Sequence, residues 1–405
     1  MSWEYKTLDQ LGEVSRGRSK HRPRNDPSLF GGEYPFIQTA DVKAANFYIT
    51  EYDTTYNEKG LAQSKLWHPG TLCITIAANI ADTGILAMDA CFPDSVMGFL
   101  PYEGVADVRF VKYCFDILQQ NCKKISQGAA QDNLSWEKLS TILFPAPPIE
   151  VQKRIADMLS AYDDLIENNQ KQIKLLEEAA QRLYKEWFVD LRFPGHETTP
   201  ITDGIPEGWQ YSPLSEVFDF VRGKSYTSKE LSDTVGVLMA NLKNIRAFGG
   251  YKRNAEKRFT GQFKENQTLA AGDVVMGVTD MTQERRLVGH VALVPDMGEP
   301  MTFSMDLIKI IPKLTDKLFV YSALYYGGLS KQISPLANGV NVLHLKPEAM
   351  MGIEMLIPHD AIVRAYHERI SPIIVRIEAL QKQCDIAAEA RDRLLPKLMN
   401  GEIEI

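Results

Sequence analysis

The most regular hydrophobic pattern in the chain lies between residues 150 and 190. Apolar side chains recur there at alternating steps of four and three positions, which keeps them on one face of an α-helix. A sustained pattern of this kind is typical of a coiled coil, and one extra step of four, from 169 to 173, adjusts its phase. The predicted seam consists of Val151, Ile155, Met158, Tyr162, Leu165, Asn169, Ile173, Leu176, Ala180, Leu183 and Trp187.

A second seam of the same kind occupies the last 45 residues. Asp360 is a good N-cap for this helix, and Pro372 predicts a kink or break near its first turns. Helices of this length span roughly 50–60 Å and cannot bury a seam alone, so we expect the two to pair, antiparallel. The second predicted seam consists of Ile362, Tyr366, Ile370, Ile373, Ile377, Leu380, Cys384, Ala387, Arg391, Leu394 and Leu398.

The segments that precede the two helices are related to each other. Short β-branched runs such as 71–77 and 273–278 alternate with turns, and longer stretches at 108–122 and 317–333 have a helical pattern, so each segment is predicted to be an α+β module. The motif RG(R/K)S occurs in both. Trp3, Leu8, Arg16, Gly17 and Ser19 recur 206 positions later as Trp209, Leu214, Arg222, Gly223 and Ser225, and later matches have an offset of 211.

The sequence therefore predicts an α+β protein with two pseudo-symmetric α/β modules and two long, antiparallel coiled-coil helices. The expected boundaries are 1–148 for the first module, 149–192 for the central helix, 193–210 for a linker rich in Pro and Gly, 211–359 for the second module, and 360–405 for the C-terminal helix.

Composition narrows the class of protein. The 405 residues carry a net charge of −7, no apolar run is long enough to span a bilayer, and the chain starts without a signal-peptide pattern. The five cysteines form no CxxC pair, which favours a reducing compartment, and we expect a cytoplasmic protein without membrane contact. Scattered His and Cys residues predict no metal site.

Positive charge is local. Residues 16–24 place five cations on alternate positions, and residues 222–258 hold nine cations against three acids. Such windows are typical of nucleic-acid contact, but the first is equally compatible with a solvated edge strand or an ordinary loop. A phosphate-binding loop is excluded at 218–225, because Phe218 stands where that motif requires glycine.

The sequence predicts no catalytic site. The tetrapeptide APPI at 146–149 lacks the polar first residue and the aromatic last residue of an amino-methyltransferase motif. Asp163 and Asp164 are adjacent on a helix, so they point to different faces.

The ordered set of motifs resembles the specificity subunit of type I restriction–modification systems. The similarity covers essentially the whole chain and rests on the opening W…L…V.RG.S pattern, the passage ISQGAAQDNLSWEKLSTILFPAPPIEVQKRIADMLSAYDDLIE, the linker GIPEGW and the ending ARDRLLPKLMNGEIEI. The resemblance implies two target-recognition domains, each reading one half of a split double-stranded DNA sequence. It also implies that the helix pair sets the spacing and docks two modification (methyltransferase) subunits, to which restriction (motor–nuclease) subunits are added.

The resemblance further implies a non-catalytic chain that binds no cofactor itself, with S-adenosylmethionine, ATP and Mg²⁺ on the partner subunits. Two alternatives remain open at this point: a coiled-coil protein-binding adaptor that does not read DNA, and, more remotely, a stand-alone DNA-modifying enzyme. The candidate DNA-binding residues are Arg16, Arg18, Lys20, Arg22, Arg24, Gln38, Lys43 and Gln127 in the first module, and Arg222, Lys224, Tyr226, Asn241, Lys243, Asn244 and Arg246 in the second.

Overall fold

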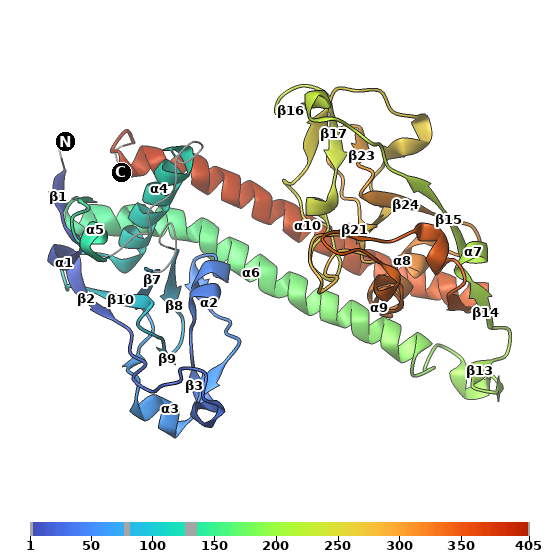
Figure 1. The fold of residues 1–405 in the computed structure, drawn as a ribbon, viewed down its shortest axis with the longest axis horizontal. Coiled ribbons are helices and arrows are strands. Elements are labelled where there is room, and N and C mark those ends of the chain that lie inside the picture. Colours follow the sequence, from blue (N-terminus) through green and yellow to red (C-terminus); the bar gives the residue numbers. More distant parts are fainter. Residues whose placement is uncertain (1–2, 77–81, 126–135, 404–405) are drawn as a thin grey trace. The chain divides into compact units, whose positions relative to one another are not determined.

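The computed structural model describes residues 3–76, 82–125 and 136–403 (Figure 1). The chain forms two compact units, and each is described by itself. The first unit comprises Met1–Lys171 and Gln381–Ile405, and the second comprises Gln172–Leu380. Two 40-residue helices, α6 (Ile149–Phe188) and α10 (Asp360–Met399), each contribute one end to each unit.

The first module is built on a five-stranded sheet with the order β2-β10-β7-β8-β4. All neighbours in this sheet are antiparallel except β4 and β8, and β2 lies at one edge. Helix α4 (Val108–Ile125) packs on the sheet, and the core between them also takes in Ile155, Leu159 and Leu398 from the long helices. The sheet strands are β2 (Gly12–Arg16), β10 (Val96–Pro101), β7 (Leu72–Thr75), β8 (Thr83–Leu86) and β4 (Tyr48–Ile49).

Smaller elements complete this module. Three two-stranded pairs are β1 (Glu4–Lys6) with β11 (Phe144–Ala146), β3 (Phe30–Pro35) with β5 (Thr55–Tyr56), and β6 (Leu66–Trp67) with β9 (Ala90–Cys91). The short helices are α1 (Leu8–Leu11), α2 (Thr39–Ala44), α3 (Glu58–Ala62) and α5 (Trp136–Leu139).

The second module repeats the arrangement of the first sheet. Strand β15 (Phe218–Arg222) occupies the edge that β2 has in the first module, and like β2 it ends at the arginine of the repeated motif. The sheet has the order β15-β24-β20-β22, and a second sheet has the order β16-β18-β17-β23-β19. These strands are β24 (Leu307–Pro312), β20 (Val274–Gly277), β22 (Val291–Leu293), β16 (Leu231–Ser232), β18 (Lys257–Phe259), β17 (Val237–Ala240), β23 (Met301–Phe303) and β19 (Thr268–Leu269).

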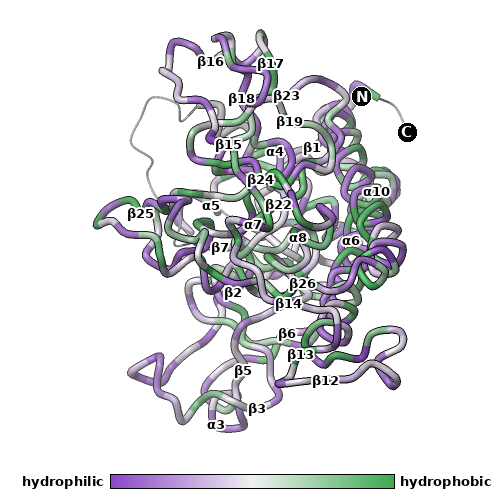
Figure 2. The backbone as a smooth tube through the Cα atoms, turned by 90° about the vertical axis from the view of Figure 1, so that its right-hand side faces the viewer, coloured by the Kyte–Doolittle hydropathy of each residue, from purple (hydrophilic) through white to green (hydrophobic). Residues whose placement is uncertain are grey.

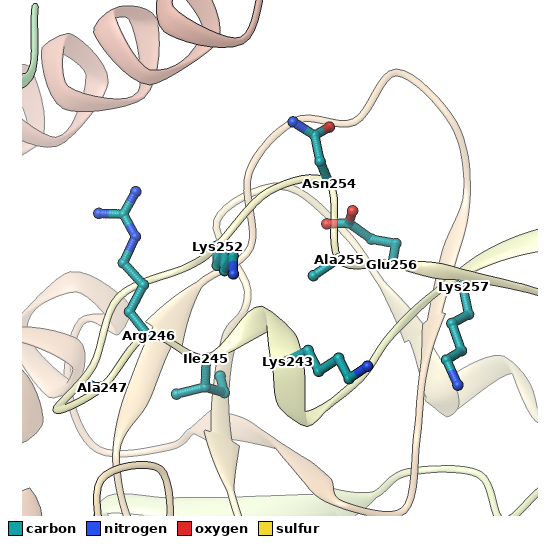
Figure 3. Close-up of a pocket in the computed structure, with 9 residues that line it drawn as sticks. All are labelled: Lys243, Ile245, Arg246, Ala247, Lys252, Asn254, Ala255, Glu256 and Lys257. Atoms are coloured by element: carbon teal, nitrogen blue, oxygen red, sulfur yellow. The ribbon is translucent and has the colours of Figure 1, made fainter. Parts of the chain in front are cut away.

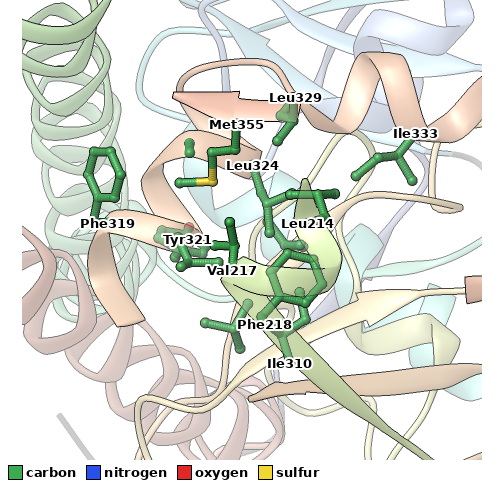
Figure 4. Close-up of a cluster of buried hydrophobic side chains, with 14 of the residues drawn as sticks. Leu214, Val217, Phe218, Ile310, Phe319, Tyr321, Leu324, Leu329, Ile333 and Met355 are labelled. Carbon is green, nitrogen blue, oxygen red and sulfur yellow. The ribbon is translucent and has the colours of Figure 1, made fainter. Parts of the chain in front are cut away.

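The core of the second unit joins the module to the two long helices. Figure 4 shows part of it, in which Phe218 and Ile310 from the sheet pack with Tyr321 and Leu324 from α8. Trp187 and Tyr366 bring α6 and α10 into the same core. The remaining elements are α7 (Leu214–Val217), α8 (Lys317–Tyr325), α9 (Ser330–Ile333), β12 (Ile201–Thr202) with β13 (Ile205–Pro206), β14 (Gln210–Pro213) with β26 (Glu354–Ile357), and β21 (Thr279–Asp280) with β25 (Leu343–His344).

The ends of α6 and α10 pack antiparallel within each unit. In the first unit Asn169 Nδ2 donates to Gln383 Oε1 over 3.3 Å, and in the second Arg376 donates to Gln172 Oε1 over 3.3 Å. Ile173, Ile377 and Leu380 form a small buried cluster in the second unit. Figure 2 shows both hydrophobic (green) and hydrophilic (purple) parts in the coils of α6 and α10.

Two details of the helix prediction are wrong. Met158 and Leu165 are exposed, whereas Leu159 and Ile166 beside them are buried, because this part of α6 packs on the core of the first module as well as on α10. The buried face is therefore rotated from a two-helix seam. Helix α10 also continues through Pro372, so of the kink or break predicted there the break is wrong, and the kink stays a prediction.

Candidate nucleic-acid interface

The repeated RG motif forms the same anchored turn in both modules. In the first, Gly17 N donates to Val96 O over 2.8 Å and Arg18 N donates to Phe92 O over 2.9 Å. A Cβ on Gly17 would lie 2.4 Å from two carbonyl oxygens, so only glycine allows this approach. The motif thus fixes the position of the loop after the edge strand.

The second module uses the same geometry. Gly223 N donates to Leu307 O over 3.1 Å and Lys224 N donates to Phe303 O over 2.8 Å. A Cβ on Gly223 would lie 2.0 Å from Ser304 O. The cations beside each glycine are therefore presented by equivalent, rigid backbones.

All five cations of the first window are exposed. Arg24 pairs with Asp94 over 2.7 Å, and Arg22 Nη1 donates to two backbone carbonyls of its own loop. Within the described residues, the side chains of Arg16, Arg18 and Lys20 form no hydrogen bond or ion pair. Exposed cations without a protein partner are suited to bind phosphate, since they need not break an existing pair.

Two further candidates of the first module, Gln38 and Lys43, lie at α2. Gln38 and Lys43 are exposed at the start and near the end of α2, and Gln38 Nε2 donates to Thr54 Oγ1 over 3.2 Å. Gln127 lies outside the described residues.

At the second RG turn the charge is partly neutralised. Arg222 Nη2 donates to both carboxylate oxygens of Glu348, over 2.7 and 2.8 Å, and this interaction lowers the pKa of the Glu348 carboxyl. Lys224 and Tyr226 are half-buried beside it, and burial raises the pKa of the Tyr226 hydroxyl. Arg222 therefore has a competing partner that a phosphate would have to displace.

A basic pocket lies a short distance along the same chain segment (Figure 3). Lys243, Arg246, Lys252 and Lys257 line it and are all exposed. Its acid, Glu256, is engaged at the rim, where Oε1 accepts hydrogen bonds from Tyr251 (2.8 Å) and Asn244 (2.9 Å). The other lining residues are Ile245, Ala247, Asn254 and Ala255.

Asn241 and Asn244 hold this pocket in shape. Both are buried, at 6% and 0% exposure. Asn241 Nδ2 donates to Ala255 O over 2.8 Å, and Asn244 Nδ2 donates to Lys252 O over 2.9 Å. Their amides already have partners in the loop, which suits a role in holding the shape of the loop better than direct contact with a base.

Lys252 and Lys257 line the pocket but are not among the DNA-binding residues predicted from the sequence. Both belong to the basic window 222–258, but a window does not say which of its cations share one surface. A fold is needed to bring Lys243, in the short turn Leu242–Asn244 that follows β17, beside Lys257 at the start of β18.

Two other kinds of site were predicted to be absent, a metal site and a membrane span. The described residues contain no group of His, Cys, Asp and Glu side chains arranged to hold a metal ion. Neither long helix has an apolar stretch of bilayer-spanning length, and the same is true of every other helix in the described part of the chain. Asp163 is buried and Asp164 exposed, so this carboxylate pair does face two directions, as the sequence predicts.

Comparison with known proteins identifies the family. The model for the type I restriction modification DNA specificity domain matches twice, at residues 1–178 and 206–384. The MjaIX specificity subunit of Methanocaldococcus jannaschii is 26% identical over 100% of this chain and 94% of the relative. The HindI specificity subunit of Haemophilus influenzae is 21% identical over 97% of this chain and 98% of the relative.

A solved structure supports the fold. The S subunit of a type I restriction–modification system from M. genitalium matches 98% of this chain and 96% of its own, with a TM-score of 0.60 and 14% identity. No finding supports the adaptor alternative. Since the double family match covers most of the sequence, the chain belongs to the family of type I restriction–modification DNA specificity subunits, which recognise DNA targets and are not themselves catalytic.

Proposed function

We propose that each module reads one half of a split target and that the RG turn of each is a contact with the DNA backbone. The observation that carries this is the duplicated turn, in which the same edge strand delivers cations on a glycine that no other residue can replace. Duplicated readers match a bipartite target, as in other proteins whose symmetry mirrors their half-sites.

The two modules place their free cations differently. In the first, Arg16 is the last residue of the edge strand, and Arg18 and Lys20 follow the strand directly. In the second, the cations without a side-chain partner in the described residues include Lys243 and Lys257, which line the pocket. We assign phosphate binding to both sets, because lysine and arginine contacts to phosphate fix a protein's register on the duplex.

The helix pair is proposed to set the spacing and to dock two modification subunits. Leu175 on α6 and Ile386 on α10 are 64% and 58% exposed, and their positions differ by 211, the offset of the repeat. One belongs to the second unit and the other to the first. Equivalent apolar side chains, one in each half of a duplicated chain, support two equal docking sites. S-adenosylmethionine, ATP and Mg²⁺ are assigned to the partner subunits.

Methylation mapping tests the reading function. A host carrying this chain with its modification subunit should acquire methylation at two short half-sites around a fixed gap. A continuous, ungapped target would contradict the two-reader proposal.

Salt dependence of DNA binding tests the phosphate contacts in the assembled complex. Lys20→Ala and Lys257→Ala should each weaken binding to all sequences alike and reduce the slope of log affinity against log salt by about 1. The control Lys264→Ala removes an exposed cation outside both windows and should leave the slope unchanged. Unaltered slopes in both test variants would contradict the assignment of phosphate contacts.

A further inference from the structure

Two neighbouring loops of the second module hold apolar side chains out in solvent. Met281 is 78% exposed and Val340 is 89% exposed. Their loops, 281–286 and 338–342, are joined by the pairing of β21 with β25 and by a hydrogen bond of 2.8 Å from Gln283 Nε2 to Val340 O. Among the described residues these are the two large apolar side chains with the highest exposed fractions, and the two loops that carry them are joined to each other.

The first loop is fixed from beneath by Asp280, which is 0% exposed. Its carboxylate accepts hydrogen bonds from Leu287 N (2.6 Å), Thr282 N (2.8 Å) and the Thr282 hydroxyl (2.8 Å). Burial by itself would raise the pKa of Asp280, but these donors outweigh it and lower the pKa below its ordinary value. The loop is therefore built around a buried, ionised carboxylate.

The second loop is equally constrained. Asn338 and His344 exchange two backbone hydrogen bonds, at 3.0 and 2.9 Å. Between them Gly339 has φ +154°, and a Cβ there would lie 1.9 Å from Val342 O. Val340 thus lies at the tip of a closed turn, with its side chain in solvent.

Both loops are continuous with the proposed DNA contacts. Phe248 N, in the loop that carries Arg246, donates to Arg286 O over 2.7 Å. A second connection starts from Thr279 in β21, whose Oγ1 donates to Asp306 Oδ1 over 3.0 Å. Met305, the residue before Asp306, donates from its backbone N to Lys224 O over 2.9 Å. The apolar tips therefore share a framework with the RG turn and with the basic pocket.

We propose that Met281 and Val340 form an apolar wedge that inserts between adjacent base pairs of the half-site read by the second module. The proposal rests on the DNA-reading function proposed above. Proteins that unstack a base step use Met, Leu, Ile, Phe or Pro for this purpose, set among cationic and amide side chains. Here the amides of Gln283 and Asn341 are exposed beside the two tips, and Arg286, also exposed, is ion-paired with Glu284 of the same loop.

A duplex fits these tips better than a protein surface does. Protein-docking patches are broad and continuous, whereas Met281 and Val340 are separate points among exposed polar residues such as Thr282 and Asn338. Two tips on stiff turns have the form needed to enter one base step. Insertion costs least at flexible pyrimidine–purine steps, so the wedge would also favour such a step in the half-site.

The test uses the assembled complex and a duplex carrying the mapped target with 2-aminopurine at successive positions. Base unstacking should raise the fluorescence at one step of one half-site. The double variant Met281→Gln, Val340→Thr keeps side-chain size but is polar, and it should abolish this rise and weaken binding roughly tenfold. Val235→Thr, at a residue 64% exposed in the same unit, is the matched control and should retain both.

The outcomes are distinguishable. A fluorescence rise that persists in the double variant, or that is absent from the wild-type complex while DNA still binds, overturns the wedge alone. A double variant with an unchanged melting temperature that no longer assembles with its modification subunits assigns the tips to a protein surface and also overturns the wedge. A wild-type complex that fails to bind the duplex overturns the DNA-reading function and the wedge together.

Discussion

Arg391→Met probes the buried charge of Asp163, which links α6 to α10 and α4 in the first unit. The side chain of Asp163 is 1% exposed, and its carboxylate accepts hydrogen bonds from Arg391 and, over 2.5 Å, from the hydroxyl of Tyr113. Tyr113 is itself 0% exposed. Its burial is the largest cause that raises the pKa of its hydroxyl well above the ordinary value, and the neighbouring Asp163 carboxylate is the second. Tyr113 therefore remains protonated, and so a hydrogen-bond donor, at neutral pH.

Removing the guanidinium leaves a buried carboxylate with one neutral donor. Breaking a buried ion pair in this way costs about 3–5 kcal/mol, because the remaining charge is uncompensated. In Asp163→Asn, Arg391→Met the Asn oxygen still accepts from Tyr113 and no charge is buried. This double variant should be less destabilised than Arg391→Met, with a loss of about 1–2 kcal/mol.

Amide hydrogen exchange measures the loss of stability separately for each unit. In Arg391→Met, exchange of the α10 amides at 388–399 should accelerate by about two to three and a half powers of ten if local opening follows the lost free energy. Amides at 363–375, in the second unit, provide the internal control. An acceleration below about threefold, or one as large in the double variant as in the single, would refute this account of the buried charge.

Three further perturbations have defined outcomes. Leu380→Asp buries a charge at a position that is 0% exposed and should lower stability by more than about 3 kcal/mol in urea melts, whereas Leu175→Asp, at an exposed site of the other helix, should change stability little. Gly17→Ala should displace the RG loop and weaken DNA binding by the complex, while Gly352→Ala, which meets no atom within 4 Å, should not. Burial raises the pKa of Glu177, so its ionisation opposes folding as pH rises above the ordinary value of 4.5; Glu177→Gln should therefore raise the melting temperature at pH 7, and the gain should vanish below about pH 4.

Sequence periodicity was sufficient to locate the two long helices but not to define their buried faces. The predicted starts at 149 and 360 agree with α6 and α10, because the apolar spacing and the preceding prolines or Asp360 depend only on local sequence. The exposure of Met158 could not be predicted in the same way. It depends on α4, which lies elsewhere in the sequence and widens the face that α6 buries.

The same limit applies to the candidate site. The RG repeat identifies both loops from the sequence alone, since its glycines are required by local carbonyl contacts. Which cations remain available is decided by distant residues. Glu348, 126 positions away, neutralises Arg222. The side-chain amide of Asn244, another candidate, already donates a hydrogen bond to the backbone of Lys252. Such pairings leave no periodic signal.

The pairing of Arg222 has a consequence for the target. The two modules share a sheet edge and a glycine turn, so their frameworks are equivalent, but only the second carries an arginine bound to Glu348 at that turn. Its available positive charge includes Lys243 and Lys257 in the pocket, whereas in the first module it includes Arg16 and Arg18 beside the sheet edge. Cations in different places bind different phosphates, and they therefore orient different loops toward the bases. The two half-sites should therefore differ in sequence, and a palindromic target found by methylation mapping would contradict this reasoning.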